Sequence, residues 1–311
     1  MKRKLWVAAL VLALAAGVVV AGEKKAKEDI VLGLSLANLQ IDFGNQIRFG
    51  VIEEAKKQGV EVIIVDARDD ATTQIDQVQD LIARGIDGLL FIPAGASAAD
   101  VPVRDAHRAG IPVVTIDRNP QNEPGDVFIA ADSYNGCKEL GEWVIKQTGG
   151  KGKIGVVQGQ LGTTPEIDRQ AGFNEALKQA PDMVLVEQPA DTWFQEDGFR
   201  VAQDMLQVNP DITVFFGRCD GLAVGAAHAA RLAGMRDKIL VVGFDGDEPG
   251  LAAIKDGVID ATMTQAFRQF GRDAVNISLG LIEGKKYDPM HLIPVVFTTK
   301  ENVQGFIDNR P

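Results

Sequence analysis

The stretch IVLGLSLANLQIDFGNQIRFGVIEEAKKQGVEVIIVDA, residues 30–67, decides the fold class of this chain. Its two ends, 30–36 and 61–67, are short apolar runs rich in Val and Ile, which is typical of strands covered on both faces of a sheet. Between them, residues 43–58 place apolar side chains at helical spacing, and Gly59 closes the segment. The stretch therefore predicts a strand, a helix and a second strand.

The same alternation continues along the chain, first as far as residue 131 and again from 153 to 265. Strands that alternate with helices predict an α/β fold with central parallel sheets and right-handed crossovers. Because the pattern forms two blocks in 311 residues, we expect two similar doubly wound lobes. The strand-like runs stand at 30–36, 61–67, 88–93, 112–117, 126–131, 153–159, 184–190, 213–218, 239–245, 261–265 and 294–299.

The first residues have the pattern of a secretory signal. Three basic residues, 2–4, precede an uncharged run at 5–20, and small residues near Ala21 favour cleavage after it. We therefore expect a signal peptide at 1–21, a flexible leader at 22–28 and a protein exported to the periplasm or another extracytoplasmic compartment. A retained membrane anchor is the alternative, although the run is short for a bilayer span.

The composition excludes several kinds of partner and chemistry. A formal net charge of −11 disfavours nucleic acid, whose phosphates an acidic surface repels. The two cysteines, Cys137 and Cys219, lack metal-ligand spacing, and we expect them to be separate thiols. The sequence has no glycine-rich nucleotide motif and no GxSxG elbow, and its histidines, His107, His228 and His291, are scattered. We expect no enzyme activity, no cofactor and no metal.

Polar and aromatic side chains follow the predicted strands, at the edge where ligands bind in open α/β sheets. Asp, Arg and Gln offer donors and acceptors in planar geometry, and Phe and Trp offer flat faces that stack on the C–H face of a sugar. This mixture suits a monosaccharide better than a phosphate or a metal. Taken singly, each residue could instead cap a helix, pack in a core or form an ion pair. The candidate ligand-binding residues are Asp42, Phe43, Asp117, Arg118, Arg169, Trp193, Cys219, Asp245 and Gln265.

Five segments carry a more specific signal through their order and spacing: PVVTIDR (112–118), DRQAGFNEAL (168–177), DGLAVGAAHAARLAG (220–234), ILVVGFDGDEPGLAAIKDG (239–257) and DATMTQ (260–265). Together they resemble the ribose- and galactose-binding branch of the periplasmic binding proteins. The resemblance covers nearly the whole mature chain. It implies a type I periplasmic-binding-protein fold, two lobes joined by a multi-strand hinge, and service as the solute-binding component of an ABC importer.

The resemblance also implies roles for the residues that would bond sugar hydroxyls. Asp117 and Arg118 would act from the N-terminal lobe, and Arg169 from the C-terminal lobe. Asp245 would take hydroxyls at the end of its strand, and Gln265 would do so where the chain crosses between lobes. The hinge would close on the sugar because these bonds are complete only in the closed form.

Aromatic contacts and two departures complete the comparison. Phe43, with Asp42, would reach the sugar from the first loop, and Trp193 would stack on the opposite face. Cys219 stands where the family usually has Asn, so this corner of the pocket is expected to be more apolar or to face a ligand without a hydroxyl there. The loop 36–45 lacks the paired aromatics common in ribose binders, and no galactose-binder calcium loop is present.

The implied lobes are discontinuous, with the N-terminal lobe at 29–131 and 266–293 and the C-terminal lobe at 132–265 and 294–311. The expected partners are a pentose, hexose or cyclitol, an ABC permease and its ATPase, and the expected oligomeric state is a monomer. A sensing component that docks on a chemoreceptor or sensor kinase would use the same lobes. A transcriptional regulator would need a helix-turn-helix where the signal peptide stands, and an enzyme would alter the bound sugar.

Overall fold

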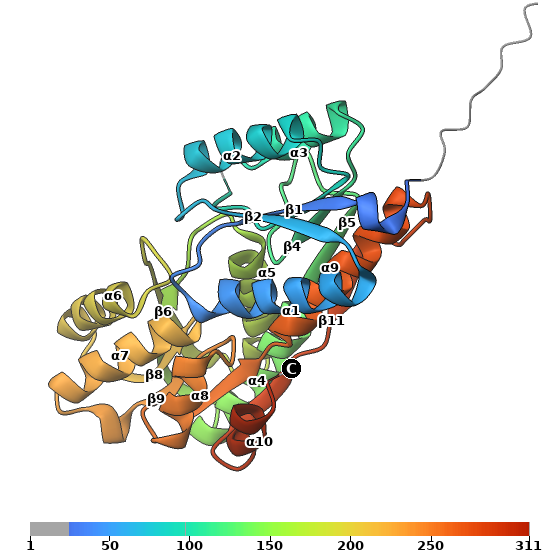
Figure 1. Ribbon diagram of the computed structural model, residues 1–311. Coiled ribbons are helices and arrows are strands. Elements are labelled where there is room, and N and C mark those ends of the chain that lie inside the picture. Colours follow the sequence, from blue (N-terminus) through green and yellow to red (C-terminus); the bar gives the residue numbers. More distant parts are fainter. Residues whose placement is uncertain (1–24, 97, 311) are drawn as a thin grey trace, which may run out of the picture.

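The computed structural model describes residues 25–96 and 98–310, and it consists of two α/β lobes, each built on a six-stranded sheet (Figure 1). The predicted signal peptide lies outside the described residues. In the described part of the predicted leader, Lys25 Nζ lies 2.8 Å from a carboxylate oxygen of Asp87, and Lys27–Asp29 form the 3-10 helix η1. No helix within the described residues is long and apolar enough to cross a membrane.

The first lobe contains a wholly parallel sheet with the strand order β11-β5-β4-β3-β1-β2. Helices α2 and α3 cover one face of this sheet, and α1 and α9 cover the other (Figure 1). The elements are β1 (Val31–Leu36), α1 (Asp42–Gln58), β2 (Glu61–Asp66), α2 (Ala71–Ala83), β3 (Gly88–Phe91), α3 (Asp100–Arg108), β4 (Val113–Ile116), β5 (Val127–Ala131), α9 (Phe267–Ile282) and β11 (Met290–Ile293).

The second lobe repeats this plan with the order β12-β10-β9-β8-β6-β7, in which only β12 runs antiparallel to its neighbour. Its core lies between the sheet and α4 and α5 on one face, and α6, α7 and α8 on the other. The elements are α4 (Ser133–Thr148), β6 (Lys151–Gln158), α5 (Thr164–Leu177), β7 (Asp182–Pro189), α6 (Gln195–Val208), β8 (Ile212–Gly217), α7 (Asp220–Leu232), η2 (Arg236–Lys238), β9 (Leu240–Val242), α8 (Glu248–Lys255), β10 (Ala261–Thr264), β12 (Val296–Thr299) and α10 (Val303–Asp308).

Local sequence explains why α1 and α9 can pack so closely on the first sheet. A side chain at Gly50 of α1 would meet the carbonyl oxygen of Arg268, and one at Gly271 of α9 would meet that of Ile47. The two glycines therefore let the helix backbones approach, while Gly59 ends α1 in the left-handed conformation with φ of 74°. Their shared apolar face closes the core of the first lobe.

Three chain crossings join the two sheets: one after β5, one after β10 and one after β11. They bring the carboxyl ends of the parallel strands of both sheets to the same interlobe space. The predicted α/β fold with two similar lobes is confirmed. The strand β11 was missing from the predicted strands, since its alternating exposed residues lack the continuous apolar character of the other runs.

Candidate ligand-binding site

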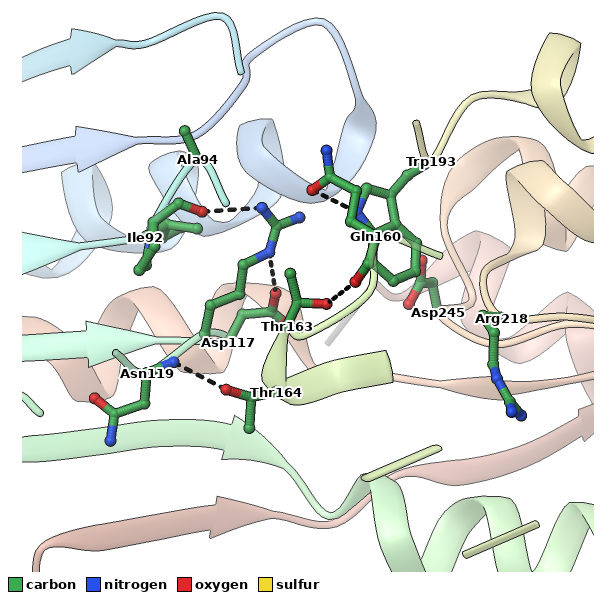
Figure 2. Close-up of polar contacts among 12 residues, drawn as sticks. Ile92, Ala94, Asp117, Asn119, Gln160, Thr163, Thr164, Trp193, Arg218 and Asp245 are labelled. Carbon is green, nitrogen blue, oxygen red and sulfur yellow. Dashed lines mark hydrogen bonds and ion pairs between the residues drawn. The ribbon is translucent and has the colours of Figure 1, made fainter. Parts of the chain in front are cut away.

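A cavity of about 270 Å³ lies between the lobes, at the carboxyl ends of strands from both sheets. Side chains from both lobes line it, and Figure 2 shows Asp117, Trp193 and Asp245 around this space. Of the predicted site residues, the structure brings eight to the cavity wall: Asp42, Phe43, Asp117, Arg118, Arg169, Trp193, Cys219 and Asp245. Gln265 lies behind this wall, where its amide Nε2 donates to Asp245 Oδ1 at 2.7 Å.

The first lobe contributes two buried residues of opposite charge, Asp117 and Arg118, which directly follow β4. Asp117 has a φ of 64°, a left-handed conformation that is uncommon for a residue with a side chain and is often found at functional sites. Arg118 donates from Nη1 to the carbonyl oxygen of Pro93 at 2.9 Å, and its Nε lies 3.6 Å from Asp117 Oδ2. The carbonyl group of Pro93, which follows β3, thus holds the Arg118 guanidinium beside the Asp117 carboxylate at the cavity wall.

Phe43 and Asp42 enter the site from the first turn of α1. The ring of Phe43 packs edge-on against Phe267, with centroids 5.2 Å apart, so its position is fixed by the core of the first lobe. The Asp42 carboxylate is already engaged by the protein. Its Oδ1 accepts from Gln46, and its Oδ2 accepts from Arg310 at 2.8 Å and from the backbone N–H of Glu248 at 3.0 Å. Asp42 therefore bridges the lobes at the edge of the cavity.

The second lobe contributes a matching pair, Arg169 and Asp245. Arg169 is buried in α5, and its Nη2 donates to Asp245 Oδ1 at 2.9 Å. Its Nη1 donates to the carbonyl oxygen of Arg218, and its guanidinium lies 4.0 Å from the centroid of the Phe244 ring. Asp245 has a φ of 129°, a second uncommon backbone conformation at this site.

Burial and charge together set the protonation of these carboxyl groups. Burial raises the pKa of Asp117, and the guanidiniums of Arg118 and Arg169 oppose that rise. Burial raises the pKa of Asp245 to about 6, again against the effect of Arg169. Burial and the neighbouring Asp245 raise the pKa of Asp247, another cavity residue, to about 7. Hydrogen bonds donated to these carboxylates would stabilise their ionised forms, because such bonds offset the desolvation of the charge.

The loops after β7 and β8 supply the remaining predicted residues. Trp193 Nε1 donates to Gln160 Oε1 at 3.2 Å, and its ring lies 5.8 Å from the guanidinium of Arg118 and 5.9 Å from that of Arg169. Cys219 caps α7, where its Sγ accepts from the backbone N–H of Leu222. The indole ring therefore lies close to two guanidiniums, one from each lobe.

A second layer of buried charge holds Arg169 in place. Arg218, fully buried after β8, donates from Nε to Glu166 Oε1 at 2.9 Å, and Glu166 Oε2 accepts from the backbone N–H of Gly159 at 2.8 Å. Figure 2 also shows a contact between the lobes, in which the Asn119 backbone N–H donates to Thr164 Oγ1 at 3.1 Å. These contacts fix the end of α5 that carries Arg169.

Several cavity residues were not among the predicted set. Asp247 follows Asp245 in the same loop, so its position after the strand could have indicated it. Phe194 stands beside Trp193 and could have been found in the same way. The others lie in the loop before α1 or in the first turns of helices, where the exact start of the helix decides which side chains face the cavity: Gln40, Ile41, Pro165, Gln195, Glu196, Gly221 and Pro249.

Comparison with known proteins identifies relatives over nearly the full chain. Residues 32–286 match the model of the periplasmic binding protein domain. The ribose import binding protein of Bacillus subtilis is 34% identical over 275 residues, which are 88% of this chain and 89% of that protein. Both matches span the two lobes and the residues that line the cavity.

Two solved structures have the same fold and carry sugar-related names. An ABC transporter solute-binding protein from Bacillus halodurans, with bound myo-inositol, is 26% identical with a TM-score of 0.83, covering 90% of this chain and 98% of that one. The fructose-binding periplasmic domain of a hybrid two-component system is also 26% identical with a TM-score of 0.83, covering 89% and 93%.

Proposed function

Because this chain belongs to the periplasmic binding protein family, we propose that it is an exported solute-binding protein that captures a monosaccharide or related polyol between its lobes and delivers it to an ABC importer. One observation carries the proposal. Arg118 and Asp117 from one lobe and Arg169 and Asp245 from the other line a single cavity of about 270 Å³. That volume suits a small ligand.

The chemistry of the cavity fits a neutral polyol. Each sugar hydroxyl can donate and accept, and the cavity offers carboxylates as acceptors and guanidiniums as donors. The guanidiniums of Arg118 and Arg169 both line the cavity, and their Nε atoms are buried without a hydrogen-bond partner among the described residues. Phe43 and Trp193 supply flat faces for the C–H surface of the ring. The nine predicted residues form this proposed site, with Gln265 holding Asp245 and Asp42 bridging the lobes.

Closure of the lobes is the proposed mechanism of capture. A ligand bonded to Asp117 on one side and to Arg169 on the other gains its full set of contacts only when the lobes meet. Its differential affinity for the closed form then shifts the population toward that form. The closed pair of lobes presents the surface that the permease recognises, and the sugar leaves chemically unchanged.

The proposal also includes the cellular location, the oligomeric state and the boundaries of the lobes. The signal peptide at 1–21 directs export to the periplasm or an equivalent compartment, and the protein acts as a monomer without a cofactor. The lobes correspond to 29–131 with 266–293 and to 132–265 with 294–311. A sensing role, in which the closed form docks on a chemoreceptor or sensor kinase, is the second candidate, favoured by the similarity to the periplasmic domain of a two-component system.

Calorimetric titration of the purified protein with pentoses, hexoses and cyclitols tests the proposal. We expect at least one sugar to bind with a dissociation constant in the micromolar range or below, and mass spectrometry to recover it unaltered. The absence of heat with every member of the panel would contradict sugar capture. Copurification of a permease and an ATPase with the sugar-bound form, but not with the free form, would separate transport from sensing.

A further inference from the structure

One corner of the cavity differs in character from the rest. It is formed by the side chains of Cys219, Trp193 and Phe194, which follow β7 and β8 in the second lobe and all line the cavity. We call these three side chains the thiol corner. The charged groups Asp117, Arg118, Arg169 and Asp245 line the same cavity, and the guanidiniums of Arg118 and Arg169 lie 5.8 and 5.9 Å from the Trp193 ring.

The thiol of Cys219 has no donor left for a ligand, and its sulfur is only a weak acceptor. Its Sγ donates to the carbonyl oxygen of Trp193 at 3.3 Å and accepts from the backbone N–H of Leu222 at 3.4 Å. Burial raises the pKa of this thiol well above its ordinary value, so it stays neutral. A thiol has one proton, which is used here, and its sulfur accepts only weakly. It therefore presents a small, polarisable, apolar surface to the cavity.

The other two side chains of the thiol corner are equally unable to bind a hydroxyl. The single N–H of the Trp193 indole is directed to Gln160 Oε1 at 3.2 Å, and Phe194 has no polar atom in its ring. A ligand hydroxyl placed against these three side chains would lose its water without gaining a side-chain partner. Such an unpaired buried group costs about 1–3 kcal/mol.

From this asymmetry, and resting on the proposed function, we infer that the ligand presents a deoxygenated or methyl-bearing carbon to the thiol corner while its hydroxyls face the charged groups. The ligand class is thus a deoxy or methyl-substituted polyol rather than a fully hydroxylated sugar. A hydrogen or methyl group at that carbon packs against sulfur and aromatic carbon without desolvation of a polar group. Cys219 would determine the preference for a deoxygenated carbon more than the charged residues that bind the hydroxyls.

Matched pairs of sugars test the inference directly. The pairs are L-rhamnose with L-mannose, L-fucose with L-galactose, and 2-deoxy-D-ribose with D-ribose, each titrated calorimetrically. We expect the tightest ligand of the panel to be a deoxy member that binds the wild-type protein about ten to a hundred times more tightly than its hydroxylated partner, the range that corresponds to an unpaired hydroxyl. Tighter binding of the hydroxylated member in every pair would overturn the inference.

Two substitutions at one position supply the control. Both Asn and Ser are good N-cap residues, so Cys219→Asn and Cys219→Ser keep the start of α7. In Cys219→Ser the hydroxyl replaces the thiol between Trp193 and Leu222, and the preference should persist. Cys219→Asn adds an amide with spare donors, and hydroxylated sugars should gain at least tenfold in affinity. An unchanged preference in a folded Cys219→Asn protein would count against the inference.

The outcomes separate this inference from the proposal on which it rests. If no sugar of either kind binds, sugar capture itself is wrong. If sugars bind but the wild-type protein favours the hydroxylated members, only the role of the thiol corner is wrong. Thermal unfolding of both variants shows whether a loss of binding reflects a loss of fold.

Discussion

Arg310 Nη1 donates to Asp42 Oδ2 at 2.8 Å, which joins the end of the chain in the second lobe to the first helix of the first lobe. Both side chains are mostly buried, at 18% and 15% exposure. The same carboxylate oxygen accepts from the backbone N–H of Glu248 at 3.0 Å, and Arg310 Nη2 lies 3.5 Å from the Glu248 carboxylate. These contacts join the two lobes beside the cavity, and in the proposed mechanism they favour the closed form.

Removal of this bridge should therefore speed ligand release. In Arg310→Gln we expect the dissociation rate to rise roughly fivefold, since a partly buried charged hydrogen bond contributes about 1 kcal/mol. Stopped-flow tryptophan fluorescence measures that rate. Arg200→Gln is the matched control, because Arg200 pairs with Asp191 and Asp197 inside the second lobe. Equal rates in Arg310→Gln and the control would contradict a closing role for the bridge.

The affinity for the sugar should depend on pH through Asp245. Burial raises the pKa of this carboxyl to about 6, and a hydroxyl that donates to it needs the ionised form. Below pH 6 the protonated fraction grows, so affinity should fall about tenfold by pH 5 and level off above pH 7. Calorimetry across this range measures the effect. Asp245→Asn should bind weakly with no such inflection, and a flat profile in the wild type would contradict the assignment.

Stability should depend on pH through Asp247. Burial and Asp245 raise the pKa of Asp247 to about 7, so the folded state holds this proton more tightly than the unfolded chain. The contribution of Asp247 to the free energy of unfolding is then greatest below about pH 4. It decreases as the pH rises toward 7 and is constant above that pH. Asp247→Asn keeps the N-cap of α8, whose Gly250 N–H bonds this side chain.

We therefore expect Asp247→Asn to melt at a higher temperature than the wild type at pH 8, with the difference vanishing near pH 4. At about 1.4 kcal/mol per pK unit, the gain is at most about 4 kcal/mol. Scanning calorimetry at pH 4, 6 and 8 measures it. If Asp247→Asn were less stable than the wild type at pH 8, ionisation of Asp247 would not destabilise the folded state, which would contradict the prediction.

Arg169 should matter for both fold and binding. Arg169→Met leaves the Asp245 carboxylate buried without its guanidinium, which costs about 3–5 kcal/mol of folding stability. Adding Asp245→Asn removes that charge and should recover part of the stability, while sugar binding stays lost. Urea denaturation and calorimetric titration of the single and double variants provide the two readouts. Recovery of binding in the double variant would exclude a ligand-bonding role for both residues.

A single methyl group can test the position of Trp193. A side-chain carbon built at Gly159 would overlap the Trp193 ring, so Gly159→Ala must displace the indole. We expect affinity for the sugar to drop at least tenfold, as for loss of a stacking aromatic, with a shift in tryptophan emission. Gly305→Ala, where nothing lies within 4 Å, is the control. Unchanged affinity in Gly159→Ala would place the ligand away from this ring.

The sequence indicated which residues line the cavity where those residues directly follow strands. Asp117 and Arg118 follow a continuous apolar run, and so does Asp245, which makes their position at the sheet edge readable from the pattern alone. Arg169 was also among the polar residues predicted near the strand ends, but it lies within α5, and its role in binding was only implied by the resemblance. Its neighbour Arg218 escaped prediction altogether, because a buried arginine depends on distant partners such as Glu166.

The remaining differences concern features fixed by tertiary contacts. The hydrogen bond between Asp42 and Arg310 joins residues far apart in the chain, and no local sequence pattern predicts it. The strand β11 alternates exposed and partly buried residues beside β5, so its sequence resembles a loop more than a buried strand. Helix α3 carries Pro102 in its first turn, where the missing N–H is tolerated.

A crystal structure of the protein with the ligand recovered from it tests the central claim most directly. The account predicts one sugar or polyol between the lobes, with its oxygens at hydrogen-bond distance from Asp117 or Arg118 on one side and from Arg169 or Asp245 on the other. A ligand held by residues of one lobe alone, or bound outside the cavity, would contradict it.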